Sequence, residues 1–293
     1  MTTQPTATDQ FEQFRPKLFG IAYRMLGSVM EAEDMVQETF LRWNATADSH
    51  ALIQSPNAFM TTIITRLCLD KLKSAQAQRE QYIGEWLPEP LITTESPDQM
   101  VELAESLSLA FLHMLERLTP TERAVFLLRE VFEYDYGSIA QIVNKSDANC
   151  RQLLRRARQR VADERPRFDT NSAEQQTIMM QFAMACANGD MNGLINVLAP
   201  DAIEFSDGGG RVPAARRPIY GADKIARFIL GLMRQAPDDF AYQIAQINGE
   251  LGMLGTTEGR LFVAMNFHVE GGKITRIFSI INPDKLTHLQ SLI

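Results

Sequence analysis

Apolar positions follow helical spacing through most of the first 75 residues. Apolar residues recur every three to four positions, as on one face of a helix, at Phe11, Phe14, Leu18, Ile21, Ala22 and Met25. Gly27-Ser28 interrupts this pattern, and MEAEDMVQETFLRWN then begins a second helix whose acidic first turn suits the helix dipole. A third helix is predicted over about 57–75. Its expected inward positions are Phe59, Ile63, Leu67 and Leu72.

The helical pattern returns at about residue 100 and continues to 166. Thr119-Pro120-Thr121-Glu122 is a helix start, because threonine can cap the helix and proline is favoured in its first turn. In the following helix the expected buried positions are Val125, Leu128 and Val131. Between the two helical regions, 76–104 contains three prolines and no steady period, which indicates a linker.

From about residue 170 the pattern becomes mixed. Two helical stretches precede the strand-like AIEFS, and a third, ADKIARFILGLMRQ, precedes three more strand-like stretches. Those three are FAYQIAQIN, GRLFVAMNFHV and KITRIFSIIN, with glycines between and around them. The pattern predicts an α+β domain with an antiparallel sheet over 170–293.

Composition and termini limit the class of protein. A chain of 293 residues favours two or three domains. It has no apolar run near the roughly 18–20 residues that span a bilayer, and MTTQPTATDQ is not a signal peptide. Its three cysteines have no paired spacing, which argues against disulfides or a zinc site. We therefore expect a cytoplasmic protein without membrane association or bound metal.

Charge is distributed unevenly, although the net charge is −7. Residues 76–105 carry seven acids against Arg79 alone, whereas 145–160 carry six bases against Asp147 alone. Because local potential governs encounter with phosphate, the basic segment is a candidate for nucleic-acid binding despite the acidic total.

The basic segment follows a turn between two short helices. A helix around Ser138–Val143 ends at Asn144, which tolerates a left-handed turn, and Ser146 or Asp147 can cap the next helix. The expected apolar positions of that second helix are Ala148, Leu153, Leu154, Ala157 and Val161. This is the helix-turn-helix arrangement, whose arginine, asparagine and glutamine side chains can read base edges. An arginine-rich helix that only faces solvent is the alternative.

The order of these motifs resembles one family. DMVQETFLRW followed by a basic helix, and then LTPTERAVFLLREVFEYDYGSIAQIV and RQLLRRARQR, resemble the two DNA-binding domains of bacterial extracytoplasmic-function sigma factors. The resemblance covers about 9–75 (region 2) and 105–166 (region 4). Ser138 replaces a glutamate common in relatives, and Asn144 replaces a glycine.

The resemblance implies roles for specific residues. Core RNA polymerase would bind Asp34, Gln37 and Glu38. The −10 element would contact Asn57, Arg66, Lys71 and Lys73. The −35 element and its backbone would contact Lys145, Asn149, Arg151, Gln152, Arg155, Arg156 and Arg158. The implied partners are therefore core RNA polymerase and promoter DNA, and the implied function is promoter recognition in transcription initiation.

The third domain resembles a SnoaL or ketosteroid-isomerase-like cone. Three short motifs strengthen this resemblance, namely YIGEWLPEP in the linker, DGGGR at 207–211 and NPDKL at 282–286. Together they resemble the subgroup of these sigma factors that carries a fused SnoaL-like domain, although that subgroup usually has DGGGK, so Arg211 departs from it. The expected fold class is thus multidomain, with two all-α sigma domains and a C-terminal α+β cone.

The same resemblance implies regulation in cis by the third domain. The expected interdomain contacts involve Tyr82, Ile83, Trp86, Leu87, Pro88, Asp207, Gly208, Gly209, Gly210, Arg211, Asn282, Pro283, Asp284, Lys285 and Leu286. The linker motif could be a small apolar cluster packed on a neighbouring domain or a regulatory docking segment. The tail after Asn282 could lock or activate. DGGGR lacks the lysine and helix start of a phosphate loop and is interpreted as a glycine turn.

Two alternatives remain open. The cone could bind a small-molecule ligand or retain isomerase-like catalysis, which needs a carboxylate base opposite an acid or tyrosine. Groups of that type are Asp201, Glu204, Asp207, His268, Tyr220 and Tyr242, but no spacing pairs them. We therefore predict no enzyme and no cofactor. A helix-turn-helix regulator that needs another sigma factor is the second alternative.

Overall fold

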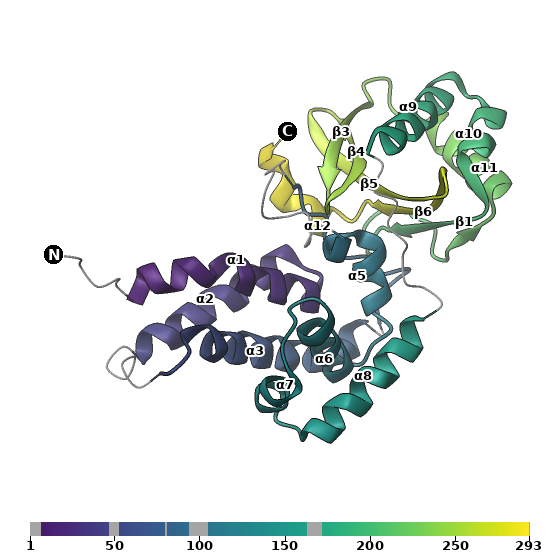
Figure 1. The fold of residues 1–293 in the computed structure, drawn as a ribbon. Coiled ribbons are helices and arrows are strands. Elements are labelled where there is room, and N and C mark those ends of the chain that lie inside the picture. The colour runs from purple at the N-terminus through teal and green to yellow at the C-terminus, as the bar shows by residue number, and fades with distance from the viewer. Residues whose placement is uncertain (1–6, 47–52, 80, 94–104, 163–171, 293) are drawn as a thin grey trace. The chain divides into compact units, whose positions relative to one another are not determined.

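The computed structural model describes residues 7–46, 53–79, 81–93, 105–162 and 172–292 (Figure 1). The chain divides into two compact units. The first consists of 1–80 and 114–165, and the second of 81–113 and 166–293. The chain therefore leaves the first unit after residue 80, returns after 113 and leaves again after 165.

The first unit is helical. Its amino-terminal helices are α1 (Ala7–Leu26), α2 (Val29–Ala45) and α3 (Pro56–Arg79). The later helices are α6 (Pro120–Glu130), α7 (Tyr136–Val143) and α8 (Asp147–Val161). They are preceded by α5 (Leu109–Leu115), most of which belongs to the second unit. The two sets of helices pack on each other through α1, α3, α6 and α7. Buried Arg123 reinforces this packing, because it donates to the backbone oxygen of Met25 at 2.7 Å.

The break between the first two helices is confirmed, but the inward face of α3 differs from the prediction. Ser28 caps α2 by accepting a hydrogen bond from the backbone N–H of Glu31. Leu72 is buried as expected, whereas Phe59, Ile63 and Leu67 are only partly buried. The fully buried apolar positions are instead Met60, Ile64 and Cys68. The difference arises because α3 is covered on two sides, by α1 and α2 and by α6 and α7.

The predicted caps of the later helices are confirmed. Thr119 and Glu122 form a reciprocal capping box at the start of α6. Asn144 ends α7 in the left-handed region, with φ 53° and ψ 56°, and Ser146 caps α8. Three apolar assignments differ from the structure. Val131 follows the end of α6 and is only partly buried, as is Leu153. Ala148 is exposed, and Cys150 takes the inward position.

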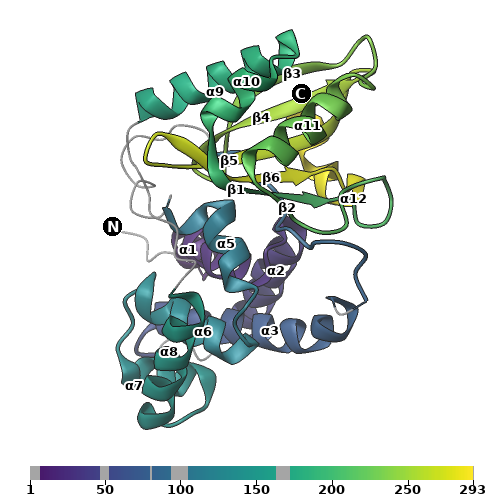
Figure 2. The same cartoon turned by 90° about the vertical axis from the view of Figure 1, so that its right-hand side faces the viewer.

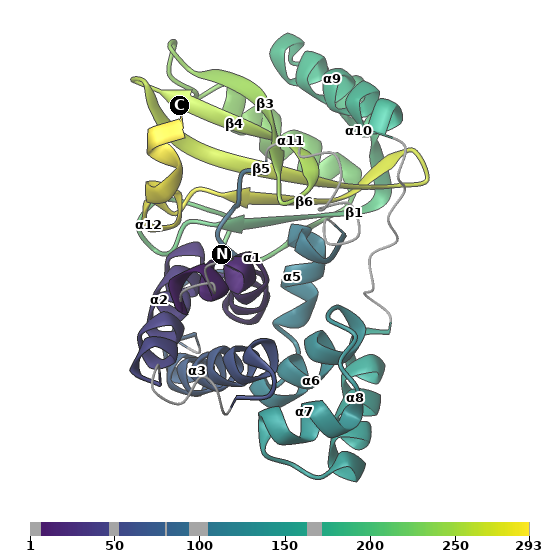
Figure 3. The same cartoon turned by 60° about the vertical axis from the view of Figure 1, so that its left-hand side comes forward.

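The second unit is built on a six-stranded sheet of order β2-β1-β6-β5-β4-β3 (Figure 3). The strands are β1 (Leu198–Asp207), β2 (Ile219–Tyr220), β3 (Ala241–Ile247), β4 (Glu250–Thr257), β5 (Arg260–Glu270) and β6 (Lys273–Ile280). The helices are α9 (Ser172–Asn188), α10 (Met191–Val197), α11 (Ala222–Met233) and the short α12 (Pro283–Leu286). Two 3-10 turns, Glu105–Leu107 and Thr287–Leu292, complete the unit.

The sheet corrects the sequence prediction twice. It is antiparallel except that β1 pairs with β6 in parallel, so it is not a purely antiparallel sheet. Strands β2 and β4 were also not predicted, because β2 has only two residues and the glycines of β4 are of a type that usually interrupts a strand pattern. A Cβ on Gly252 would lie 2.5 Å from the oxygen of Met265, and one on Gly255 would lie 2.6 Å from Val263 Cγ1. These glycines thus allow close approach within a strand rather than ending it.

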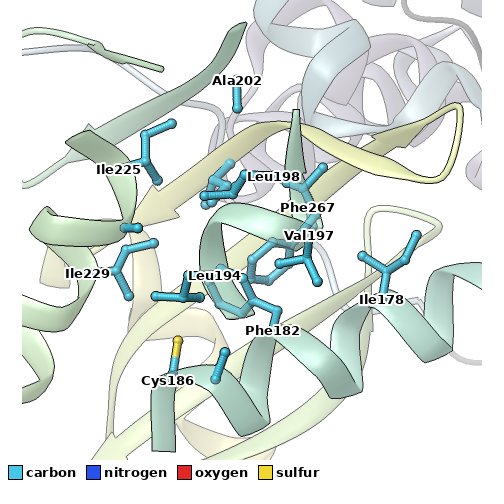
Figure 4. Packing of buried hydrophobic residues seen from close by; sticks show 14 of the residues in the cluster. Ile178, Phe182, Cys186, Leu194, Val197, Leu198, Ala202, Ile225, Ile229 and Phe267 are labelled. Atoms are coloured by element: carbon cyan, nitrogen blue, oxygen red, sulfur yellow. The ribbon is translucent and has the colours of Figure 1, made fainter. Parts of the chain in front are cut away.

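Helices α9, α10 and α11 cover one face of the sheet (Figure 2). The core between them contains Phe182 and Phe267, whose ring centroids lie 4.8 Å apart, together with Leu194 and Ile225 (Figure 4). Ile277 belongs to the same cluster. The result is a sheet with helices on one face, the α+β architecture that the sequence pattern predicts for this domain. The opposite face is contacted by α5, where the His113 ring lies 4.6 Å from that of Phe205.

The described middle of the linker, residues 81–93, is part of this sheet domain. Ile92 forms an antiparallel bridge with Ile247, and the Thr93 N–H donates to the Gln246 oxygen at 3.0 Å. Asn248 accepts from the Leu91 N–H and donates to the Leu107 oxygen, both at 2.8 Å. Residues 81–93 therefore pack on the sheet within the second unit. The acidic positions Glu80, Glu95, Asp98 and Glu102 lie outside the described residues.

Candidate promoter and polymerase interfaces, and the contacts among the three motifs

Helix α8 presents a basic surface. Cys150, Leu154, Ala157 and Val161 are buried, so the intervening positions face outward. All seven residues predicted to meet the −35 element are exposed, namely Lys145, Asn149, Arg151, Gln152, Arg155, Arg156 and Arg158. An exposed row of guanidinium and amide groups on the second helix of a helix-turn-helix can meet both base edges and phosphates.

A hollow beside α8 was not predicted. It has a volume of about 290 Å³, and Tyr136, Arg151, Arg155, Arg158 and Gln159 contribute to its lining. The Arg151 guanidinium lies 4.1 Å from the centroid of the Tyr136 ring, so the ring supports that cation. Arg158 donates to Glu130 at 2.8 Å, and this ion pair raises the pKa of Arg158.

The residues predicted to meet the −10 element all have partners within the first unit. Lys71 lies 3.1 Å from Glu31, and Lys73 lies 3.2 Å from Asp70. Asn57 accepts from Lys17 at 3.2 Å. Arg66 donates to two backbone oxygens of α7, those of Gln141 and Ile142, at 2.8 and 3.0 Å.

Helix α2 carries the predicted polymerase-binding residues on a face that also exposes apolar groups. Asp34 and Gln37 are exposed, and Glu38 pairs with Arg42 at 2.8 Å. Met30 and Leu41 are each 55% exposed and lie on the same helical face as Asp34 and Gln37 at i, i+4, i+7 and i+11 spacing. Large exposed apolar side chains next to polar groups are typical of protein-binding surfaces, in which apolar contacts are flanked by a polar rim. Their spacing in the sequence would have allowed this prediction.

The structure brings the three short motifs together around Asp207 of β1. The Asp207 carboxylate is fully buried and accepts from the Tyr82 hydroxyl at 2.6 Å and from the Leu87 N–H at 2.9 Å, both in the linker motif. It also accepts from the Gly209 N–H at 2.9 Å and from Lys285 Nζ at 2.7 Å. We call this arrangement the Asp207 cluster, consisting of Tyr82, Trp86, Leu87, Asp207, Asn282 and Lys285.

Lys285 is the cationic partner of the Asp207 cluster. Its side chain is 8% exposed, and its ammonium lies 4.0 Å from the centroid of the Trp86 ring and 5.2 Å from that of Tyr82. It also donates to the Leu87 oxygen. Asn282 Nδ2 donates to the Tyr82 hydroxyl at 2.9 Å, and burial together with the bond to Asp207 raises the pKa of Tyr82. Every polar group at the centre is thus engaged.

The glycines of DGGGR allow this close packing. Gly209 has φ 59° and Gly210 has φ 70°, which are left-handed values that favour glycine. A Cβ on Gly209 would collide with the Asn282 amide, and one on Gly210 would lie 2.9 Å from Ile83 Cδ1. A Cβ on Gly208 would lie 2.5 Å from the Val212 oxygen. The glycine turn therefore packs closely against both the linker, at Ile83, and the C-terminal tail, at Asn282.

The remaining predicted motif residues lie around this cluster. Leu87, Pro88 and Leu286 are buried, while Ile83 is 54% exposed. Pro283 and Asp284 are exposed at the start of α12. Arg211 pairs with Asp284 at 3.1 Å, but both side chains are more than 60% exposed, so this pair contributes little to stability.

The acids and bases considered for catalysis do not converge. Tyr220 and Tyr242 are 59% and 42% exposed, and Asp201 is exposed. His268 Nδ1 instead lies 3.1 Å from Glu250. Glu204 is buried and accepts from Ser206 at 3.0 Å, and burial raises its pKa to about 8. A cavity lined by Ile178, Phe267 and their neighbours has a volume of only about 10 Å³, which is about the least that a single water needs and far below the size of a small-molecule site.

Within the described ranges, no three histidine, cysteine, aspartate or glutamate side chains gather as a metal site would require. No helix in the same ranges has the length and apolar character to cross a membrane.

Comparison with known proteins identifies the family. Residues 10–78 match the family model for sigma-70 region 2, and residues 108–161 match that for sigma-70 region 4. The chain is 38% identical over 292 residues to the ECF RNA polymerase sigma factor SigJ of Mycobacterium tuberculosis, covering 95% of this chain and 92% of SigJ. It is 33% identical over 282 residues to the probable ECF RNA polymerase sigma factor SigI of the same species, covering 94% and 93%.

Solved structures agree with the sequence comparisons. The crystal structure of SigJ superposes with a TM-score of 0.77 at 35% identity, covering 96% of this chain and 98% of that one. The similarity therefore includes the sheet domain as well as the two helical regions. This chain belongs to the ECF RNA polymerase sigma factors and directs transcription initiation as one of them.

Proposed function

We propose that this sigma factor contacts promoter DNA through α3 and α8 and core polymerase through α2, and that its third domain controls these activities through the Asp207 cluster. For α8, the support is the exposed row from Asn149 to Arg158 beside a cation-rich hollow. For α2, it is the exposed face from Met30 to Leu41. We expect the protein to act in the cytoplasm, where core polymerase transcribes.

The Asp207 cluster is the observation that carries the proposed control. It joins the segment between regions 2 and 4, the β1 turn and the C-terminal tail through one buried carboxylate. Residues 81–93 lie in the segment that connects region 2 to region 4, so packing them on the sheet domain shortens the chain that is free to span the two regions. A domain that holds this segment can therefore restrict the separations available to the two DNA-binding regions. Loosening the cluster would change how often they reach the two promoter elements together.

Reconstituted transcription tests this control. We expect Asp207→Asn and Tyr82→Phe to change the yield from a promoter that depends on this chain and core polymerase, because both remove contacts between the linker and the sheet domain. The matched control is Asp223→Asn, an exposed aspartate on α11 that pairs with Arg227. Equal yields from all four proteins at equal folded concentration would refute regulation through this cluster.

Alanine substitutions in α8 test promoter recognition separately. Loss of a side chain that reads a base costs about 1–3 kcal/mol in affinity for the matching promoter and relaxes specificity at that position. We expect this from Gln152→Ala or Arg155→Ala. A phosphate contact would weaken binding to all sequences alike and reduce the salt dependence. Unchanged binding in both variants would contradict the proposed role of α8.

We propose no catalytic role and no bound small molecule for the third domain. The candidate acid and base groups either have structural partners, as His268 has Glu250, or are solvent-exposed, as Tyr220 and Tyr242 are. A metabolite that stabilised the isolated protein against heat would argue against this part of the proposal.

A further inference from the structure

Strand β3 is an edge of the six-stranded sheet, and the linker pairs with one end of its outer side (Figure 3). At that end the Gln246 oxygen accepts from the Thr93 N–H at 3.0 Å. The backbone groups on one side of a strand come from alternate residues, so Tyr242 and Ile244 direct their N–H and C=O outward as Gln246 does. Within the described part of the chain, these outward groups have no hydrogen-bond partner, so the edge is open over 241–245.

The side chains of Tyr242 and Ile244 extend the apolar core face of the sheet to this edge. Ile244 lies directly opposite Met253 of β4, and Met253 is buried in the core formed with α9, α10 and α11. Cross-strand neighbours project to the same face, as do alternate residues of one strand, so Tyr242 and Ile244 both project to the helix-covered side. They are nevertheless 42% and 44% exposed. Within the described structure, the helices therefore leave this part of the core face open to solvent.

Helix α9 adds two methionines at the same edge. Met180 and Met184 are more than half exposed and lie one turn apart. Ala185, on the other flank of α9, faces α10, because a Cβ on Gly193 would lie 3.1 Å from the Ala185 Cβ. Helix α10 contacts β1 whereas α9 contacts β4, so the methionine flank is directed away from β1 and toward β3. The β3-edge surface, as we call it, consists of Met180, Met184, Tyr242 and Ile244.

The β3-edge surface is uncharged as well as apolar. Strand β3, AYQIAQI, contains no acid or base, and α9 contains none from Gln175 to its end at Asn188. Exposed sheet edges usually carry a lysine, a proline or an inward-pointing charge that prevents pairing with another strand, and the sequence of β3 has none of these. A charged partner gains nothing from such a surface. An identical surface matches both its apolar side chains and its outward backbone groups.

We propose that the β3-edge surface binds the same surface of a second copy of this chain, with the two β3 strands paired antiparallel. The centre of the open stretch 241–245 is Gln243, so a two-fold axis at Gln243 pairs this stretch with its copy without displacing Thr93. Tyr242 then lies opposite Ile244 of the second copy in a hydrogen-bonded pair, and such aromatic–β-branched pairs stabilise a sheet. Gln243 lies opposite its own copy.

The same axis brings the methionines of both copies to one side of the joined sheet. A two-fold axis normal to the sheet keeps the helix-covered faces on the same side. The two β4 strands are then three strand spacings apart, about 14 Å, whereas directly packed helices lie about 8–10 Å apart. Met180 and Met184 of each copy fill the remaining gap between the two α9 helices. Four large side chains per copy make a small interface, so we expect a transient dimer with a dissociation constant in the micromolar range.

Sedimentation equilibrium of the full-length protein over a range of concentrations tests the dimer. We expect the apparent mass to rise from that of a monomer toward that of a dimer. Ile244→Lys and Met184→Lys each place a charge in the β3-edge surface, and each should weaken association by about tenfold or more, because the ammonium loses its hydration in the dimer. The matched control is Leu232→Lys, which should associate as the wild type does. It charges an exposed leucine on α11, the helix that contacts β1 at the other side of the sheet.

Disulfide trapping tests the register of the two strands. The three native cysteines are buried, so a cysteine introduced on β3 reacts with its own copy. In the proposed pairing the two Gln243→Cys side chains face each other in a non-hydrogen-bonded pair, with Cα atoms about 4.5 Å apart, which a disulfide can bridge. The control Ala241→Cys lies on the same face of the same strand, but its copies are about 13 Å apart along the strands. We expect a covalent dimer that reductant reverses from Gln243→Cys and none from Ala241→Cys.

Each contrary result overturns a defined part of the proposal. A monomer at every concentration, with no trapping of Gln243→Cys, would overturn the dimer. Association that survives both Ile244→Lys and Met184→Lys would assign the dimer interface to another surface. Equal trapping of Ala241→Cys and Gln243→Cys would refute the two-fold register. Melting temperatures of the lysine variants within a few degrees of the wild type would show that association is lost without unfolding, and trapping decides the outcome if a lysine variant unfolds.

Discussion

Removing the charge of Asp207 tests whether the buried ion pair with Lys285 determines the stability of the second unit. Asp207→Asn keeps the size of the side chain but removes the negative partner of Lys285, whose ammonium lies 2.7 Å from the carboxylate and is 8% exposed. The new amide also brings donor hydrogens toward groups that already donate, the Leu87 N–H and the Lys285 ammonium. A buried lysine is therefore left without its counter-charge.

The expected loss in the free energy of unfolding follows from this geometry. Removing one member of a buried ion pair costs about 3–5 kcal/mol, because the other charge remains desolvated. The two rings around Lys285 offset a small part of that cost. For a unit of this size each kcal/mol moves the melting temperature by about 2–4 °C, so we expect a fall of about 10 °C. The loss should be largely restored in the Asp207→Asn, Lys285→Met double variant, in which no buried charge remains.

Trp86 provides the signal, because its ring stacks on the Lys285 ammonium. The chain has two tryptophans, and the other, Trp43, lies in the first unit, so a Trp43→Phe background isolates the reporter. Urea unfolding followed by Trp86 fluorescence would give the free energy of unfolding of the second unit. A loss below about 1 kcal/mol, or a double variant no more stable than Asp207→Asn, would refute the reasoning that buried charge dominates here.

Three further predictions concern single sites. Burial raises the pKa of Glu204 to about 8, so its stabilising contribution is complete below about pH 4.5 and is lost as the pH rises through 8. The melting temperature of Glu204→Gln should therefore rise relative to that of the wild type between pH 5 and 9, and a constant difference would contradict this. Gly255→Ala should lower stability by about 1–3 kcal/mol because its Cβ meets Val263 at 2.6 Å, whereas the control Gly231→Ala, with nothing within 4 Å, should be neutral or stabilising in thermal unfolding. Leu41→Ser should weaken binding to core polymerase in a pull-down titration without altering the melting temperature by more than a few degrees, because Leu41 is 55% exposed; unchanged binding would remove α2's apolar face from the interface.

Local chemistry made the helix-turn-helix predictable. Its turn needs a residue that tolerates the left-handed region and a hydroxyl cap three residues before an N–H, and Asn144 and Ser146 supply these in sequence. The resemblance to the family also selected the three motifs that meet at Asp207. The pairing of Asp207 with Lys285, however, joins residues 78 positions apart, and no local spacing specifies such a contact.

Other features depended on tertiary context. Strand β4 was missed because Gly252 and Gly255 break a strand pattern in isolation but fit where neighbouring side chains approach closely. The face of α3 shifted because the helix is covered from two sides. The hydrogen bonds of Tyr134 to Lys17 and Thr61 could not be predicted, because these partners are distant in sequence and a tyrosine between two helices is common.

The path of residues 81–93 changes what it means to remove the third domain. Leu87 is fully buried against groups that come from beyond residue 166, and Ile92 completes an edge of a sheet made entirely from that later sequence. A protein shortened to its two DNA-binding regions would keep this segment but lose its binding site, and would present an orphaned apolar strand to solvent. Such a fragment therefore differs from the full protein in more than the loss of a regulatory domain. Its activity and solubility would reflect both the loss of regulation and the exposure of the linker. Single substitutions in the full chain separate these two effects, whereas truncation does not.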